Sequence, residues 1–177
     1  MEKKYEIILA GTGGQGLVTS GIMLAEAGIF DGKNVVQTQS YGIAQRGGFS
    51  SAEVILSEGE ILYQKIEHPD IIIVLSDSVV DRYTDATATV LYDSSLMKDY
   101  GDKGWQGLPF YQTALSLGSV KMANLVAIGA MIENVSPVTF ASMAKTIRKK
   151  FAPKVADLNI EAMRRGMEAV RIMGKGE

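Results

Sequence analysis

The sequence predicts a single α/β domain that is doubly wound around a mainly parallel sheet, and two observations support this prediction. Apolar, β-rich runs alternate with segments of helical periodicity, which is the pattern of βαβ units. A glycine loop, Gly11–Gly16, also separates the first apolar run from the first helical segment. The chain has 177 residues, a length typical of one domain, and we expect residues 1–177 to form it.

The first βαβ unit is expected near the N-terminus. Tyr5–Ala10 is a short apolar run that ends at glycine and predicts a buried strand. A helix is predicted from Leu17 to about Phe30, because apolar residues recur there at spacings of four, three and four: Val18, Ile22, Ala25 and Ile29. Asn34–Gln39 is the second strand, and a right-handed crossover makes the two strands parallel.

The middle of the chain predicts the remaining strands. Phe49–Ser57 alternates in polarity, and we expect it to form an antiparallel hairpin with Ile61–Tyr63. Asp70–Ser76 contains five consecutive aliphatic residues, which is typical of a buried parallel strand. Thr87–Tyr92 is a further strand, and Gly107–Tyr111 is expected at a sheet edge.

The last third of the chain is predicted to be helical. An apolar helix is expected over Lys121–Asn134, in which Asn124 is expected as a cap near the start, with a contact to a ligand as the alternative. Ser136 is predicted to cap the next helix, with Pro137 at its first position. A final helix is expected from about Val155 to Met173.

Composition excludes several chemistries. The chain has no cysteine and one histidine, His68, which excludes disulfides, structural zinc, protein-ligated iron–sulfur clusters and cysteine nucleophiles. We therefore expect neither a catalytic residue nor a metal site on this chain. The formal net charge of −2 argues against a nucleic-acid partner. No signal peptide and no run long enough to cross a bilayer is present, so we expect a soluble, cytoplasmic protein.

The first glycine loop predicts an anion site. Gly11, Gly13 and Gly16 satisfy the pattern G-x-G-x-x-G between a strand and a helix, which is a Rossmann-like context, and Gly14 adds a fourth glycine beside Gln15. Glycines let the backbone approach a phosphate, and the helix N-terminus adds positive potential. A tight turn without a ligand would give the same pattern.

The identity of the anion is narrowed by what the sequence lacks. A dinucleotide site usually places Asp or Glu at the end of the second strand, whereas here that strand ends Gln37-Thr38-Gln39-Ser40. No Gly-Lys-Ser/Thr follows the glycines, so the P-loop is absent as well. A ligand that contains pyrophosphate but is neither NAD nor ATP remains.

A second glycine loop leaves the end of the second strand. It reads Ser40-Tyr41-Gly42-Ile43-Ala44-Gln45-Arg46-Gly47-Gly48. Both glycine loops are expected at the edge where open α/β sheets bind ligands, so they should face one crevice. Arg46 can offer a guanidinium fork beside the N–H groups of Gly47 and Gly48. An exposed arginine in a turn would also fit this segment.

Together these motifs resemble the gamma subunit of 2-oxoacid:ferredoxin oxidoreductases. The resemblance rests on the two loops at this spacing, on Asn124…Gly129, and on Asn159-Ile160-Glu161-Ala162-Met163…Gly166, and it runs from about residue 5 to residue 170. It implies a multisubunit enzyme that oxidatively decarboxylates a 2-oxoacid to an acyl-CoA and passes electrons to ferredoxin. This chain would be inactive alone.

The resemblance also implies where the cofactors lie. Thiamine diphosphate, Mg and the iron–sulfur clusters would sit on partner alpha and beta subunits, with a delta subunit as a further candidate. This chain would cover the active site and bind coenzyme A, with Gly13, Gly14, Gln15 and Gly16 at its phosphates. Ser40, Tyr41 and Arg46 would flank the phosphates or meet the neighbouring subunit.

The substrate and two further functions stay open at this point. Ser40-Tyr41-Gly42 resembles 2-oxoglutarate or branched-chain enzymes more than pyruvate enzymes. Ile43-Ala44-Gln45 replaces the proline and acid of many such members, which leaves room for an indolepyruvate oxidoreductase small subunit. The sequence is also compatible with a stand-alone nucleotide-binding Rossmann protein and with a pure interaction module.

Overall fold

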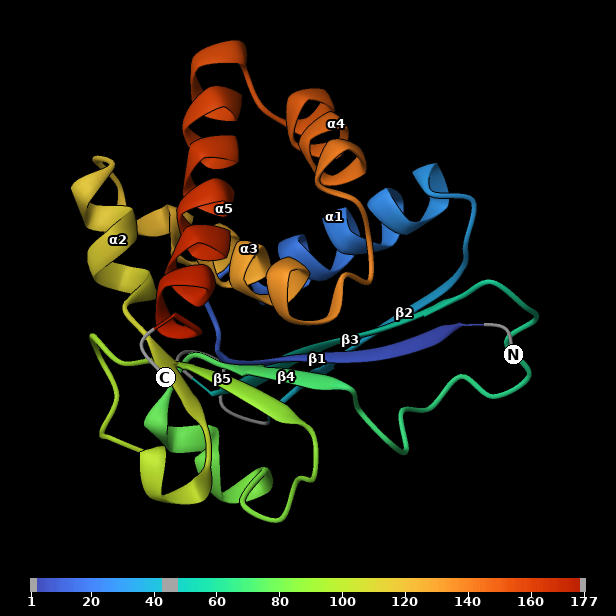
Figure 1. Ribbon diagram of the computed structural model, residues 1–177. Helices are drawn as coiled ribbons and strands as arrows, with labels where there is room; N and C mark the ends of the chain where they lie inside the picture. The colour runs from blue at the N-terminus through green and yellow to red at the C-terminus, as the bar shows by residue number, and fades with distance from the viewer. Residues whose placement is uncertain (1–2, 43–47, 176–177) are drawn as a thin grey trace.

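The computed structural model describes residues 3–42 and 48–175, and its strands form one sheet in the order β2-β3-β1-β4-β5-β6 (Figure 1). The strands are β1 (Lys4–Thr12), β2 (Asn34–Tyr41), β3 (Phe49–Ser57), β4 (Ile71–Val74), β5 (Thr89–Asp93) and β6 (Gln106–Leu108). β1, β4, β5 and β6 pair in parallel, whereas β3 is antiparallel to both β1 and β2. The predicted α/β class, with a mainly parallel sheet and an antiparallel part, is confirmed.

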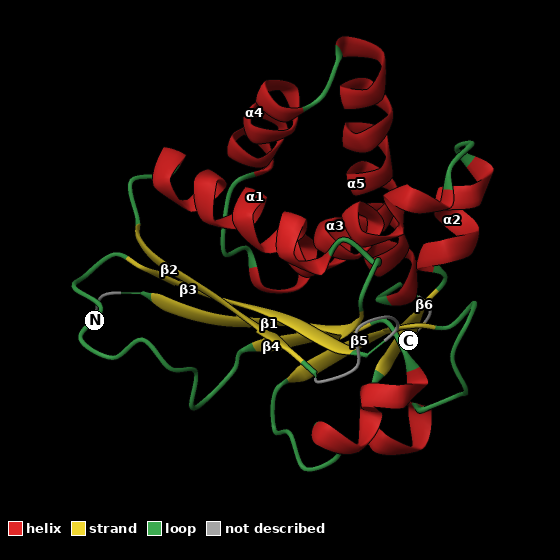
Figure 2. Ribbon diagram, turned by 180° about the vertical axis from the view of Figure 1, so that it is seen from behind, coloured by secondary structure: helices red, strands yellow, loops and turns green. Residues whose placement is uncertain are grey.

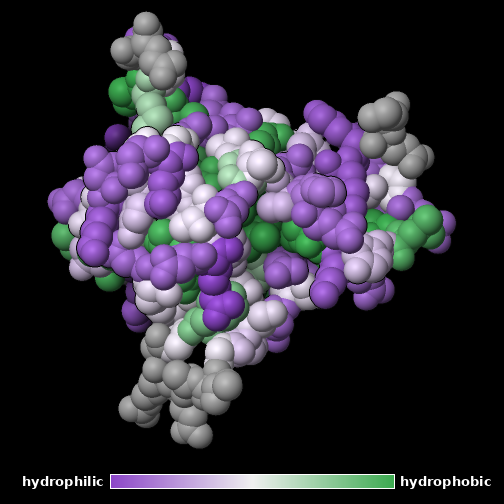
Figure 3. Space-filling model, turned by 90° about the horizontal axis from the view of Figure 1, so that it is seen from below, coloured by the Kyte–Doolittle hydropathy of each residue, from purple (hydrophilic) through white to green (hydrophobic). Residues whose placement is uncertain are grey.

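The two faces of the sheet are covered by different kinds of structure (Figures 1 and 2). The α-helices gather on one face: α1 (Leu17–Phe30), α2 (Phe110–Ser116), α3 (Ala123–Val135), α4 (Phe140–Lys150) and α5 (Pro153–Met173). The opposite face carries the short 3₁₀-helices η1 (Asp77–Arg82) and η2 (Gly101–Lys103), while a third, η3 (Val120–Met122), leads into α3. Figure 3 looks onto that opposite face and shows a mostly hydrophilic surface. Within the described residues, no helix combines the length and apolar character needed to cross a membrane.

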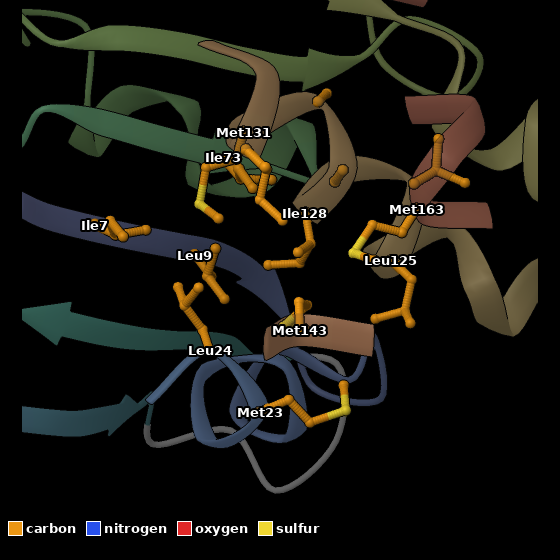
Figure 4. Close-up of a cluster of buried hydrophobic side chains, with 14 of the residues drawn as sticks. Ile7, Leu9, Met23, Leu24, Ile73, Leu125, Ile128, Met131, Met143 and Met163 are labelled. Carbon is orange, nitrogen blue, oxygen red and sulfur yellow. The ribbon is translucent and has the colours of Figure 1, made fainter. Parts of the chain in front are cut away.

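The main core lies between the sheet and the α-helices. Side chains of β1, β4, α1, α3, α4 and α5 point toward one another there (Figure 4). Ile7 and Leu9 of β1, Met131 of α3 and Met163 of α5 all belong to this core, and each of these side chains is almost completely buried. This packing fixes the C-terminal ends of β1 and β4 beneath the starts of α1 and α3.

The strand that follows β2 takes a different partner from the one predicted. β3 lies between β1 and β2 and pairs with both, in registers that include Tyr5↔Leu56 and Val35↔Leu56. Ile61–Tyr63 is not a strand, so the predicted hairpin is wrong. The physical reason is that both edges of β3 are already occupied. β1 and β2 run in the same direction, as predicted, but they are not neighbours.

The helix α1 has the predicted bounds but buries a different face. The residues of α1 that face the core include Leu24 and the two glycines Gly21 and Gly28. A Cβ on Gly21 would lie 2.8 Å from the Cβ of Ala52, so the helix packs very close to the sheet. The predicted apolar stripe points elsewhere, since Ile22 and Ile29 are 40% and 62% exposed.

The crossing of α3 and α5 explains two glycines. A Cβ on Gly129 would overlap the carbonyl oxygen of Met163, and a Cβ on Gly166 would overlap that of Val126. These glycines therefore allow two helix backbones to touch.

The connection between α3 and α4 corrects the predicted cap. Ser136 ends α3 in the left-handed conformation (φ 48°), and α4 starts at Phe140 with Thr139 as its N-cap. Thr139 Oγ1 accepts a hydrogen bond from the Ser142 N–H at 3.1 Å. The prediction of Ser136 as a cap and Pro137 as the first helical residue is wrong, because the turn after α3 needs several residues to reach α4.

Candidate anion site

The first glycine loop leaves the start of α1 open. Gly14 (φ 96°) and Gly16 (φ 74°) adopt left-handed conformations that favour glycine. Gly16 is the N-cap of α1, and no side chain among the described residues caps this helix. The first hydrogen bond of the helix joins the Ser20 N–H to the Gly16 carbonyl at 2.9 Å. The N–H groups before Ser20 therefore point out of the helix, where an anion could accept from them.

The side chain of Gln15 holds this loop in place. Its Oε1 accepts from the Thr12 N–H at 2.7 Å, and its Nε2 donates to the Leu75 carbonyl, also at 2.7 Å. Gln15 thereby joins the carboxyl ends of β1 and β4. Gly11 is needed beside it, since a Cβ there would overlap Gln15 Oε1. The side-chain amide of Gln15 is already engaged in these two hydrogen bonds, so the role of Gln15 is to position the loop.

A cavity of about 750 Å³ opens directly in front of the glycine loop. Gly14, Gln15 and Gly16 line one side, and Leu75 and Asp93 line it at the ends of β4 and β5. This is the carboxyl edge of the parallel strands, where ligands of open α/β sheets bind. The cavity volume is typical of a small-molecule site.

The rest of the cavity wall is mainly apolar, and among the described residues its cation is Lys121. Phe151, Val155 and Leu158 contribute an apolar surface from the junction of α4 and α5. Lys121 lines the cavity from η3, with Ser119 beside it. The wall thus combines a positive charge with an apolar surface, which suits an elongated ligand that has phosphates and an organic chain.

Asp93 is the acidic group of the wall. Its side chain is buried, its Oδ2 accepts from the Tyr111 N–H at 3.0 Å, and its Oδ1 accepts from the Ser95 N–H at 3.0 Å. Burial raises the pKa of Asp93, although the N–H groups of Ser95 and Tyr111 act in the opposite direction. The hydrogen bonds assign Asp93 to holding the start of α2.

Asn124 links the two helices that meet at the cavity. Its Nδ2 donates to Ser20 Oγ at 2.9 Å and lies 3.4 Å from the Gly16 carbonyl oxygen. The N-cap of α3 is Met122, so the expectation that Asn124 caps its own helix is wrong. Its Oδ1 is buried and has no partner within the described part of the chain.

The second glycine loop meets the first at the sheet edge. The Gly13 N–H donates to the Gly48 carbonyl at 3.1 Å, and the Gly42 N–H donates to the Phe49 carbonyl at 2.7 Å. Ser40 and Tyr41 do not line the cavity, and Tyr41 is 62% exposed at the end of β2. The predicted site residues Arg46 and Gly47 lie outside the described residues.

His68 and Ser76 take part in hydrogen bonds that support the fold. His68 is exposed, and its backbone N–H donates to Glu6 Oε2 at 3.0 Å. Ser76 caps η1 by accepting from the Ser78 N–H. In the ranges 3–42 and 48–175, no group of acidic or histidine side chains is arranged to hold a metal ion.

An α/β domain whose first helix begins at a glycine loop at the carboxyl edge of the sheet belongs to the class of Rossmann-like domains. Residues 6–169 match the family described as pyruvate ferredoxin/flavodoxin oxidoreductase. The chain belongs to this family, and it is a gamma subunit of a 2-oxoacid:ferredoxin oxidoreductase.

Three similar proteins illustrate this membership. The 2-oxoglutarate synthase subunit KorC of Archaeoglobus fulgidus is 38% identical over 99% of this chain and 92% of its own length. The crystal structure of a keto/oxoacid ferredoxin oxidoreductase gamma subunit from Geobacter sulfurreducens has a TM-score of 0.81 at 33% identity, and the match covers 95% of this chain and 99% of that one. The 2-oxoglutarate:ferredoxin oxidoreductase of Magnetococcus marinus, whose structure holds 2-oxoglutarate, coenzyme A and succinyl-CoA, shares the fold at a TM-score of 0.84 and 23% identity. That match covers 96% of this chain but 31% of the longer one.

Proposed function

We propose that this chain is the gamma subunit of a 2-oxoglutarate synthase and that it supplies coenzyme A binding and active-site cover to the complex. The observation that carries the proposal is the open N-terminus of α1 in front of a cavity that also contains Lys121. The 38% identity to KorC supports 2-oxoglutarate as the 2-oxoacid. Thiamine diphosphate, Mg and the iron–sulfur clusters are assigned to the alpha, beta and any delta subunits, and ferredoxin accepts the electrons from the complex.

The cavity wall offers partners for two parts of coenzyme A, the pyrophosphate and the pantetheine chain. The N–H groups at the start of α1, before Ser20, are donors for the pyrophosphate, and Lys121 adds a positive charge that oxyanions prefer. Phe151, Val155 and Leu158 offer an apolar surface for the pantetheine chain. Arg46, on the second loop, remains a candidate for a further phosphate contact.

The sheet order argues against a dinucleotide-binding domain. In such a domain the strand after the first helix lies beside the first strand, and its final acid binds the ribose. Here β3 separates β2 from β1, and β2 ends without an acid at Gln39 and Ser40. The end of β2 is therefore two strand spacings, about 10 Å, from the end of β1. Tight binding of NADH or NADPH by the chain would restore the dinucleotide function.

Reconstitution tests the proposed role. The purified chain should restore coenzyme A-dependent oxidation of 2-oxoglutarate to a complex that has been depleted of its gamma subunit. The Lys121→Ala chain should raise the KM for coenzyme A about tenfold or more and leave the KM for 2-oxoglutarate unchanged, because a lost charge-assisted contact costs about 1.5–3 kcal/mol.

The matched control is Lys65→Ala, which removes an exposed lysine from the loop before β4. It should leave both constants unchanged. Equal rises in the two KM values for Lys121→Ala would reject the coenzyme A role and point to assembly. Faster turnover of indolepyruvate than of 2-oxoglutarate by the restored complex would reject the substrate assignment.

A further inference from the structure

A second feature lies at the edge of the sheet formed by β2, where an open strand edge and an apolar helix stripe meet. β2 is the outermost strand of the sheet, and it carries no charged residue and no proline over its eight residues. Natural sheets usually protect a long edge with charges, proline or a bulge. The pairing of β2 with β3 runs from Asn34↔Ser57 to Tyr41↔Ser50 without a bulge, so this edge has none of these protections.

The hydrogen-bond pattern shows which backbone groups are free at this edge. The Gly42 N–H donates to the Phe49 carbonyl, so the residues of β2 that bond to β3 are every second one back from Gly42. The N–H and C=O groups that point outward are therefore those of Val35, Gln37, Gln39 and Tyr41. They form a complete ladder for one more antiparallel strand.

The apolar stripe of α1 faces the same direction as this edge. Gly21 and Gly28 face the sheet, and the stripe of Ile22 and Ile29 lies about a quarter turn around the helix from them. The buried residues of α1, such as Leu17, lie on its other side. The stripe is therefore turned outward beyond β2, which explains why its isoleucines are exposed although their periodicity is that of a buried face.

We propose that this face, defined as the outer edge of β2 and the stripe Val18, Ile22, Ala25 and Ile29, binds a second copy of the chain. Antiparallel pairing of β2 with its own copy would extend the six strands into one continuous twelve-stranded sheet across a twofold axis. Identical strands without charges face no repulsion when they pair in this way. This proposal is independent of coenzyme A binding.

The position of α1 fits this arrangement. A Cβ on Gly21 would contact both Ala52 of β3 and Gln37 of β2, so α1 lies over the gap between these strands. With strands about 4.8 Å apart, the two copies of α1 would lie about 10 Å apart, which is the packing distance of helices. Gln37 is at the middle of β2, so Ile22 would meet Ile22 of the other copy.

The mass of the isolated chain in solution is the first test. Sedimentation at micromolar concentrations should give twice 19.1 kDa. Gln39→Pro removes an outward N–H without breaking the bonds to β3, and it should weaken the dimer at least tenfold. Ile22→Lys places a charge on the α1 stripe of this face and should also weaken the dimer at least tenfold. Leu62→Lys is the matched control, because Leu62 is 86% exposed on another loop, and it should leave the dimer intact.

Cross-linking gives a second, local test in a chain that has no native cysteine. A residue at the twofold axis has a Cα–Cα separation of about 4.5–5.5 Å from its copy, which lies within disulfide range. Gln37→Cys or Thr38→Cys should therefore form a covalent dimer on oxidation, whereas Leu62→Cys should not. A monomeric mass, a dimer that persists in Ile22→Lys and Gln39→Pro, or equal cross-linking of the control would each overturn the proposal.

Discussion

The first four N–H groups of α1 and of α4 have no partner within their own helix, but the two N-termini are capped differently. At α4, Thr139 caps the helix, and the carboxylate of Asp31 accepts from the Thr139 N–H at 2.6 Å and from its hydroxyl at 2.8 Å. At α1 the cap is Gly16, and the helix opens into the cavity. The protein thus supplies its own anion at α4, and we propose that the phosphate of a ligand takes the corresponding place at α1.

The largest effect is expected when α1 is given an anion of its own. Gly14→Asp places a carboxylate where the phosphate is proposed to bind, in space that is otherwise open. The KM for coenzyme A in the reconstituted complex should rise about a hundredfold or more, because like charges repel in a site with low water content. Gly104→Asp is the control, since Gly104 also has a positive φ and open space. An unchanged KM in Gly14→Asp would show that the start of α1 does not bind the phosphates of coenzyme A.

The next effect concerns the side chain that holds the open end in place. Gln15→Ala leaves the Thr12 N–H and the Leu75 carbonyl without their partner, which should lower the free energy of unfolding by about 2 kcal/mol. The KM for coenzyme A should rise as well, since the loop loses its support. Urea denaturation and steady-state kinetics measure the two effects, with the exposed Gln112→Ala as control. A loss of stability with an unchanged KM would separate the loop from binding.

A smaller effect is expected at the helix that is capped internally. Asp31→Ala removes the acceptor at α4 and should cost about 1 kcal/mol of unfolding free energy, because Asp31 is partly exposed. The KM for coenzyme A should stay unchanged, in contrast to the variants at α1. Asp85→Ala, which removes an exposed carboxylate elsewhere, should change neither quantity. A raised KM in Asp31→Ala would show that the two helix ends are not separate in function.

The smallest effect is the pH dependence of the same contact. Burial raises the pKa of Asp31, but hydrogen bonds from Ser142 and Thr139 outweigh it and hold the pKa below its usual 3.8. A carboxyl whose folded pKa is lowered contributes stability above its unfolded pKa and loses it as the pH falls through the folded value. The difference in unfolding free energy between the native chain and Asp31→Asn should therefore shrink below about pH 4. A difference that stays constant down to about pH 2 would assign the contact no charge dependence.

Local sequence signals predict several elements correctly. The bounds of α1 follow from its periodicity and its flanking glycines, and the buried strand β4 follows from its aliphatic run. The glycine loop was located from its motif, and the structure gives Gly14 and Gly16 the left-handed conformations that the motif implies. These features depend on neighbours within a few residues, so the sequence contains them directly.

Features that depend on distant parts of the chain are not predicted correctly from the sequence. The stripe of Ile22 and Ile29 predicted the helix correctly but not its buried face, because Gly21 and Gly28 pack closest to the sheet. In the sequence, Gly129 and Gly166 belong to the segments that carry the family resemblance. The structure shows that they let the backbones of α3 and α5 touch. The signal for this role was only the presence of a glycine inside each helical segment.

The sequence by itself determined the α/β class, the order of most elements and the position of the first glycine loop, because periodicity and turn chemistry act over short stretches of chain. Only the tertiary structure decided that β3 lies between β1 and β2, that Gln15 joins β1 to β4, and that the cavity gathers Lys121 and Phe151 in front of α1. These features depend on contacts between residues far apart in the chain. Such contacts form when the whole core packs, and no single segment encodes them.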